Sequence, residues 1–245
     1  MAEADDNLLW IGLHEISKET AEHLGERAHC LVNLYNDWLD IWGTFTTAYS
    51  NDLPLTSLVA ADFFSLGKDL HWLHRLLHWG NYPLVIRVLR YDWELMFRAY
   101  YADVYQPSVP GDADLPGSSV DDKIHWLESR GPGLHFNSLI IPILNVLLPG
   151  SEREHYKRHW RELNKHVHPT KDLRYRMIEE SALAVRDGFD QEWAESTIDL
   201  ACDVYDLIWL MTLHRFPNCV PLLSGPRLFQ YTPRTSRLLL ELPRI

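Results

Sequence analysis

The chain has only three cysteines, Cys30, Cys202 and Cys219, and they lie far apart in the sequence. A disulfide-stapled scaffold and a zinc ribbon both need more cysteines at closer spacing, so the sequence predicts neither. Such cysteine usage is typical of a reducing compartment, and we expect a cytoplasmic location.

Long apolar runs are also lacking. The most apolar stretch, Leu139 to Leu148, is about half as long as a membrane-spanning helix. The acidic first residues contain no basic segment followed by an apolar one, so no signal peptide is expected. Glycine-rich phosphate loops, nucleophile elbows and kinase motifs are absent as well, which argues against the common nucleotide hydrolases.

Strand patterns are nearly absent, whereas apolar residues recur at spacings of three and four along most of the chain, which is typical of amphipathic helices. The clearest stripes predict three helices: one over 22–49, a second that ends at Gly80, and a third that begins at Asn81. Asn81 caps the third helix, and Pro83 lies in its first turn. The stripe of the first helix is Leu24, Ala28, Leu31, Tyr35, Trp38, Trp42 and Phe45.

Further helices are predicted in the second half of the chain. One begins at Ser119 or Val120, and Pro142 is expected to kink or end an apolar one. Ser151 and Glu154 have the spacing of a capping box at the start of another. The last two are a helix over 174–188 and one that Asp190 caps.

These elements predict an all-α fold. We expect one helical-bundle domain over residues 1–215 with a loop over 106–119, because the apolar stripes of the first three helices need later helices as partners. The proline-rich residues 216–245 are expected to form an arm that packs on the body or on a partner.

Charge is unevenly distributed. The net charge is -11, yet residues 153–176 carry eight basic and three acidic side chains. The overall acidity argues against nucleic-acid binding over the whole surface, and the local excess marks one basic segment.

When successive side chains of the helix predicted to begin near residue 151 are placed 100° apart around its axis, they fall into three stripes. Tyr156, Trp160, Leu163 and Val167 form the core face. The basic stripe contains Arg158, Arg161 and Lys165, with His168 after it. A third stripe contains His155, His159, Glu162 and His166.

The order RELNKHVH places Arg161 before His166 and His168 and resembles the Arg-(four to six residues)-His signature of the HEPN superfamily. The resemblance implies an all-helical, usually dimeric fold whose active members are metal-independent endoribonucleases of toxin-antitoxin and defence systems. By position, Arg161 matches the motif arginine, and either His166 or His168 matches the motif histidine.

The chemistry of these residues fits RNA cleavage. A histidine can take the proton from a ribose 2′-hydroxyl, and a second can protonate the departing 5′-oxygen. An arginine stays charged and can stabilise the phosphate. We therefore expect an RNA or nucleotide ligand, a homodimer and an antitoxin or other protein partner, with no metal or cofactor. The expected catalytic residues are Arg161, His166 and His168, and the expected substrate-binding residues are Arg158, Asn164 and Lys165.

Two carboxylates of the third helix are supporting candidates. Asp92 lies in an apolar stripe, where an unpaired charge is costly. One interpretation is that Arg161 or a motif histidine is its partner. The interpretation that we favour is that Asp92 forms a polar edge of the stripe. Glu94 stands four residues from Arg90 and Arg98, which predicts exposed ion pairs.

Simpler alternatives stay open. The basic stripe can be a solvated helix face, and the chain can be a non-catalytic protein-interaction bundle. A metal-binding bundle enzyme is the other alternative, since two histidine rows have the spacing of metal ligands. These rows are His71, His74 and His78, and His155, His159 and His166.

Overall fold

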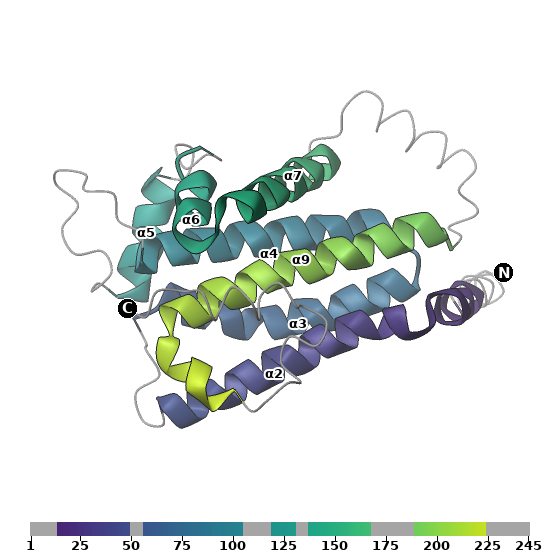
Figure 1. Cartoon of the computed structure of the whole chain (residues 1–245), viewed down its shortest axis with the longest axis horizontal. Coiled ribbons are helices and arrows are strands. Elements are labelled where there is room, and N and C mark those ends of the chain that lie inside the picture. The colour runs from purple at the N-terminus through teal and green to yellow at the C-terminus, as the bar shows by residue number, and fades with distance from the viewer. Residues whose placement is uncertain (1–13, 50–55, 105–118, 131–136, 168–188, 224–245) are drawn as a thin grey trace, which may run out of the picture.

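A computed structural model describes residues 14–49, 56–104, 119–130, 137–167 and 189–223. Four long helices run side by side, as Figure 1 shows: α2 (Cys30–Ala48), α3 (Leu58–His78), α4 (Tyr82–Asp103) and α9 (Gln191–Arg215). No strand occurs within these ranges. The predicted all-α helical bundle is therefore confirmed.

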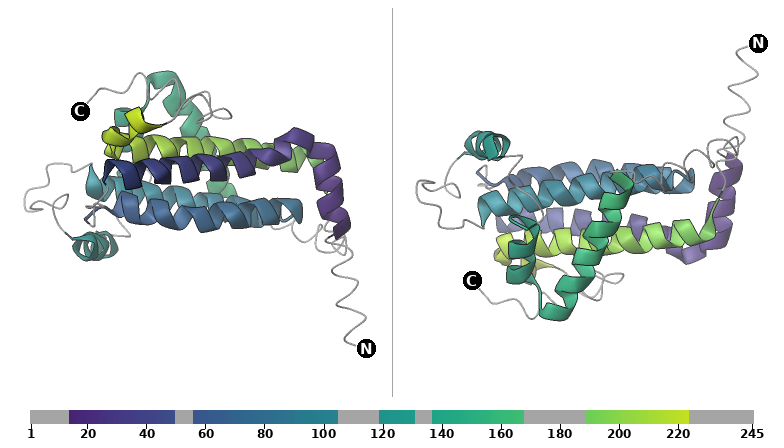
Figure 2. Two further views of the ribbon diagram at one scale, coloured as in Figure 1. Left: turned by 90° about the horizontal axis from the view of Figure 1, so that it is seen from below. Right: turned by 90° about the horizontal axis from the view of Figure 1, so that it is seen from above.

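The shorter elements lie around this bundle. α5 (Val120–Arg130) and α6 (Ile140–Leu147) are at one end, and α7 (Gly150–Val167) crosses α4 and α9 on the outside (Figure 2). The 3₁₀ segment η4 (Pro217–Leu222) packs on α2. The expected loop over 106–119, the helix over 174–188 and most of the C-terminal arm lie outside the described residues.

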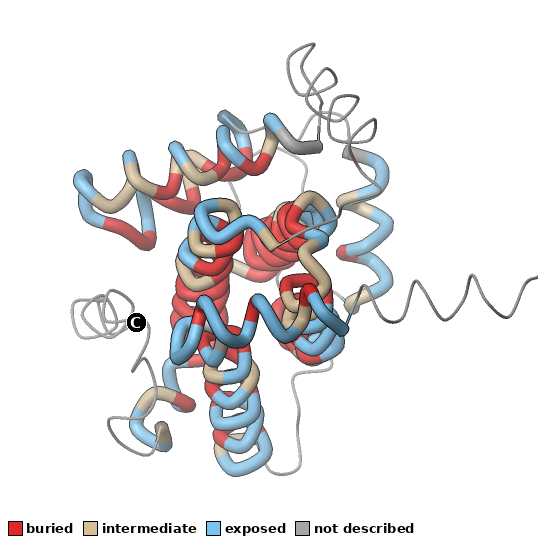
Figure 3. Tube along the Cα trace, turned by 90° about the vertical axis from the view of Figure 1, so that its right-hand side faces the viewer, coloured by how far each residue is buried: buried red, intermediate tan, exposed pale blue. Residues whose placement is uncertain are grey.

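Buried residues, red in Figure 3, lie on the sides of the long helices that face one another, and most of them are apolar. Trp93 of α4 and Trp209 of α9 are fully buried, as are Leu66, Leu70 and Leu73 of α3. Burying side chains of this size stabilises the fold by about 1.5–3 kcal/mol each, so the core holds the helix axes in place.

Predicted helix starts are confirmed at two positions. Asn81 Oδ1 accepts a hydrogen bond from Leu84 N at 3.3 Å, and Asp190 Oδ1 accepts one from Trp193 N at 2.9 Å. Each side chain satisfies a backbone N–H that has no partner within its own helix.

Three predicted boundaries are wrong. The single helix over 22–49 is interrupted by the 3₁₀ segment η1 (Gly25–His29), because Gly25 has a φ of 49° that ends the preceding helical residues 14–24. Pro142 lies in the first turn of α6, where its missing N–H has no helical partner to lose, so it neither kinks nor ends that helix. α7 begins at Gly150, which places Ser151 inside its first turn rather than at the cap.

Close packing of α2 on α3 depends on Gly67. The indole of Trp38 donates a hydrogen bond to Phe63 O at 2.8 Å and lies flat against this glycine. A Cβ at position 67 would lie 2.6 Å from the Trp38 ring, well inside van der Waals contact. The bare backbone of Gly67 therefore makes room for the tryptophan.

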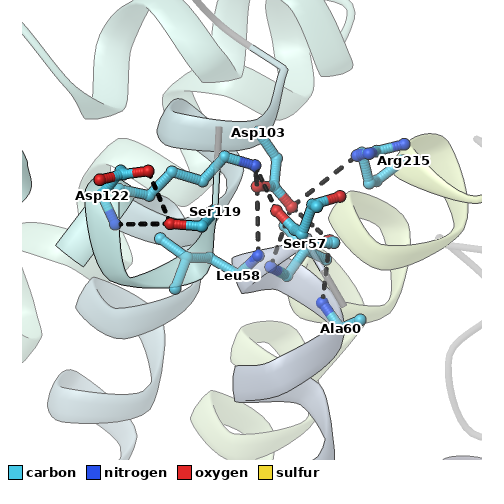
Figure 4. Close-up of polar contacts among 10 residues, drawn as sticks. Ser57, Leu58, Ala60, Asp103, Ser119, Asp122 and Arg215 are labelled. Atoms are coloured by element: carbon cyan, nitrogen blue, oxygen red, sulfur yellow. Dashed lines mark hydrogen bonds and ion pairs between the residues drawn. The ribbon is translucent and has the colours of Figure 1, made fainter. Parts of the chain in front are cut away.

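A buried polar cluster joins α3, α4 and α5 (Figure 4). Asp103, at the end of α4, accepts hydrogen bonds from Ser57 Oγ and from Leu58 N and Val59 N at the start of α3. Lys123 of α5 donates to Asp103 Oδ1 at 2.8 Å, and both side chains are fully buried. One carboxylate thus caps one helix and neutralises a buried ammonium from another.

Cys30 of α2 and Cys202 of α9 form a disulfide. The sequence spacing gave no signal for this pair, because 172 residues separate the two cysteines and only the bundle brings them together. Cys219 is free and buried, as the third, unpaired cysteine.

Candidate functional site

α7 is held on the bundle by its predicted apolar stripe. Tyr156, Trp160 and Leu163 are buried, and the ring of Trp93 on α4 packs edge-on against both Tyr156 and Trp160. This core face is confirmed as far as residue 163. It fixes the rotation of α7, so the side chains on its other faces have defined surroundings.

Arg90 of α4 further stabilises the contact between α4 and α7. Its guanidinium lies 3.7 Å from the centre of the Trp160 ring, its Nε donates to Asn164 Oδ1 at 2.9 Å, and it pairs with Glu94 at 2.6 Å. Glu94 also pairs with Arg98 at 2.8 Å. The expectation of exposed ion pairs is wrong for Arg90, whose side chain is 12% exposed because Trp160 covers it.

The predicted basic stripe is exposed to solvent. Arg158, Arg161 and Lys165 all lie on the outside of α7, and we call these three side chains the basic edge. Lys165 pairs with Glu162 at 2.7 Å. Within the described ranges, neither Arg158 nor Arg161 makes an ion pair, and both side chains are exposed on the same side of α7.

The motif histidines are placed only in part. His166 belongs to α7, but its side chain, like the whole of His168, lies outside the described residues. The proximity of Arg161 to either imidazole therefore stays a prediction. Asn164, the polar residue inside the motif, directs its side-chain oxygen inward to Arg90.

Asp92 is not a polar edge, and that prediction is wrong. Its side chain is fully buried, and Tyr205 of α9 donates to its Oδ2 at 2.6 Å. Burial raises the pKa of Asp92 well above its usual value, and the nearby carboxylate of Asp69 on α3 acts in the same direction. The described neighbours of Asp92 therefore belong to α3 and α9 rather than to α7.

Two residues of the third stripe of α7, His155 and His159, contact a carboxylate of α9 that sequence reasoning missed. His155 Nε2 lies 2.9 Å from Asp203 Oδ2, and His159 Nε2 lies 3.1 Å from the same oxygen. The two Nε2 atoms are themselves 2.9 Å apart. The only sequence signal for Asp203 is its carboxylate between apolar positions of α9, and this does not identify the facing helix.

We call His155, His159 and Asp203 the α7–α9 cluster. Their side chains are between 20% and 23% exposed, so the cluster is shielded but reachable. Asp203 also lines a cavity of about 550 Å³ with Glu26, Cys30, Asp199 and Cys202. Imidazole and carboxylate groups at these distances can exchange protons or bind a divalent cation.

The other predicted histidine row, on α3, differs in character. The rings of His74 and His78 lie 4.5 Å apart, but among the described residues only the α7–α9 cluster brings three potential metal ligands together. Burial, together with neighbouring His78, His71, His29 and Arg75, lowers the pKa of His74 to about 4. His74 is therefore neutral at pH 7.

This burial predicts acid sensitivity. As the pH falls, the unfolded chain protonates position 74 near pH 6.5, whereas the folded chain does so only near 4, so stability is lost across that window. We expect His74→Gln to flatten the fall in melting temperature between pH 7 and 4.5. The exposed His125→Gln is the control, and equal curves for both variants would contradict the assignment.

Comparison with protein families, with curated proteins and with solved structures finds no match for this chain. Among the described helices, none has the length and apolar character to cross a membrane. The basic edge of α7 and the α7–α9 cluster along its flank are therefore the two candidate functional surfaces.

Proposed function

We propose that this protein recognises RNA or a nucleotide through the basic edge of α7, as the HEPN resemblance implies. The observation that supports this most directly is the exposure of Arg158 and Arg161 on a helix whose opposite face is anchored in the bundle. Guanidinium groups form paired hydrogen bonds with phosphate oxygens, and a rigid helix presents them with little loss of entropy on binding.

The electrostatics of the chain agree with a localised contact. The protein as a whole carries -11, which repels a polyanion, so an RNA would be guided to a local group of exposed basic side chains such as the basic edge. In a twofold dimer two such helices would line one groove and double the number of phosphate contacts.

Strand cleavage is the catalytic form of the proposal. Arg161 would stabilise the negative charge on the phosphate, while His166 or His168 would accept the 2′-hydroxyl proton and the partner copy would protonate the 5′-oxygen. The bond formed joins the 2′-oxygen to phosphorus, and the bond broken joins phosphorus to the 5′-oxygen. The products would be a 2′,3′-cyclic phosphate and a free 5′-hydroxyl.

Binding of a fluorescein-labelled single-stranded RNA, measured by anisotropy over a range of salt concentrations, tests recognition. We expect Arg158→Ala and Arg161→Ala each to reduce the slope of log affinity against log salt by about 0.7, since each removes one phosphate contact. The exposed Arg87→Ala on α4 is the control and should leave the slope unchanged.

Cleavage is followed with the same RNA in the presence of EDTA. Loss of the 2′,3′-cyclic phosphate product in Arg161→Ala and in His168→Ala, with helical circular dichroism intact, is the expected result. An Arg161→Ala variant that binds and cleaves like Arg87→Ala would overturn the proposal.

A further inference from the structure

We propose that the α7–α9 cluster of His155, His159 and Asp203 binds a divalent first-row transition-metal cation such as Zn²⁺. The site goes beyond the proposed function, since metal-independent cleavage by Arg161 and a motif histidine requires no such ion. It uses residues of the third stripe of α7, which the basic edge leaves free for another task.

The three donor atoms form a nearly equilateral triangle. Its sides are 2.9 Å between the two Nε2 atoms, 2.9 Å from His155 to Asp203 and 3.1 Å from His159 to Asp203. The centre of this triangle lies only about 1.7 Å from each corner, so a cation slightly above the plane can be about 2.0–2.1 Å from all three donors. At that distance the donors subtend angles of roughly 90°, which suits a facial set of ligands.

Protons cannot satisfy the same three contacts. Each Nε2 carries at most one proton, which lies in the ring plane and is directed at one acceptor. If only one imidazole is protonated at Nε2, the lone pair of the other faces the carboxylate oxygen. If both are protonated there and donate to Asp203, the two donor nitrogens are 2.9 Å apart and neither accepts a hydrogen bond from the other. A cation removes this conflict, because all three atoms then present lone pairs to one point.

The helices prearrange the ligands. His155 and His159 are one turn apart, so they lie on the same face of α7, which Trp160 and Tyr156 hold against α4. Asp203 comes from α9, whose position in the core is fixed independently. The ion would therefore connect α7 to α9 without requiring either helix to move.

Ligand chemistry narrows the choice of ion. Two imidazoles with one carboxylate suit Zn²⁺, Co²⁺, Mn²⁺ and Fe²⁺, whereas Mg²⁺ and Ca²⁺ prefer oxygen donors alone. The cavity gives access to Asp203, and its wall carries the carboxylate of Glu26 beside the ion pair of Arg27 with Asp199, whose atoms are 2.6 Å apart. The remaining coordination positions can hold water, a phosphate oxygen or another side chain.

The test uses the full chain, treated with a chelator, dialysed and then titrated with Zn²⁺ alone in a calorimeter. We expect saturable binding of one ion per chain. His159→Ala and Asp203→Asn should each weaken Zn²⁺ binding about 100-fold, and the exposed His125→Ala should leave it unchanged. Added Zn²⁺ should also raise the melting temperature of the wild-type chain and of His125→Ala, but not that of the two ligand variants.

Co²⁺ provides a second measurement that does not depend on folding stability. We expect a visible absorption band in the wild-type complex that disappears in Asp203→Asn, while circular dichroism confirms that this variant is folded. Absence of saturable binding would overturn the site, and so would Zn²⁺ affinity in His159→Ala equal to that of His125→Ala. Binding abolished by His74→Ala alone would assign the ion to the α3 row instead. None of these measurements uses RNA, so their outcome is separate from that of the recognition experiment.

Discussion

Replacing Asp103 with alanine is expected to lower the free energy of unfolding by about 3–5 kcal/mol, the largest effect of any polar substitution in the bundle. The change leaves the ammonium of Lys123 fully buried without its carboxylate. It also removes the acceptor for Ser57 Oγ and for two backbone N–H groups at the start of α3. Urea unfolding followed by circular dichroism at pH 7 measures the loss.

Asp121, an exposed carboxylate in the first turn of α5, gives the matched control. Its replacement with alanine should cost no more than about 1 kcal/mol, since only a favourable charge near the helix start is lost. A double variant with Lys123→Met should recover part of the stability lost by Asp103→Ala, because no buried charge then remains unpaired. Equal stability of Asp103→Ala and Asp121→Ala would show that the buried cluster contributes little.

Asp92→Asn is expected to stabilise the protein, increasingly so as the pH rises. Burial raises the pKa of Asp92 above its unfolded value, so the folded chain retains a proton that the unfolded chain releases above about pH 4. Stability therefore decreases from pH 4 upward through the folded pKa of Asp92. Asparagine carries no such proton. Its side-chain oxygen can still accept the hydrogen bond from Tyr205, so this contact is retained.

Melting curves of the wild-type and variant chains between pH 4 and 8 measure this difference. The two chains should agree near pH 4 and diverge above it, by about 1.4 kcal/mol for each unit by which the pKa is raised. Some pH dependence should remain, because burial also raises the pKa of Asp62 to about 7. The exposed Asp40→Asn is the control, and a parallel curve for Asp92→Asn would refute the buried protonated carboxyl.

Local patterns were enough to predict much of the fold. Apolar spacing predicted the buried face of α7, and Asn81 and Asp190 predicted two helix starts, because those signals act within a few residues of the chain. Gly25 and Pro142 show where this reasoning stops. Depending on its surroundings, a residue with a positive φ or a proline either interrupts a helix or stands near its start. The apolar periodicity of the sequence does not distinguish these two outcomes.

The candidate site was predictable on one helix only. The histidine row on α7 could be read from its spacing, yet Asp203 could not be paired with it, since the crossing of α7 over α9 depends on the packing of Trp160 against Trp93. The prediction that Asp92 forms a polar edge was wrong for the same reason. Its partners Tyr205 and Asp69 come from helices whose relative position no local pattern contains.

The contact between Gly67 and Trp38 has a consequence for any attempt to trace the ancestry of this chain. No side chain fits at position 67 while an indole occupies position 38. A larger residue at position 67 therefore requires a smaller residue at position 38. If distant sequences without detectable overall similarity show correlated substitutions at positions 38 and 67, this would indicate descent from the same bundle.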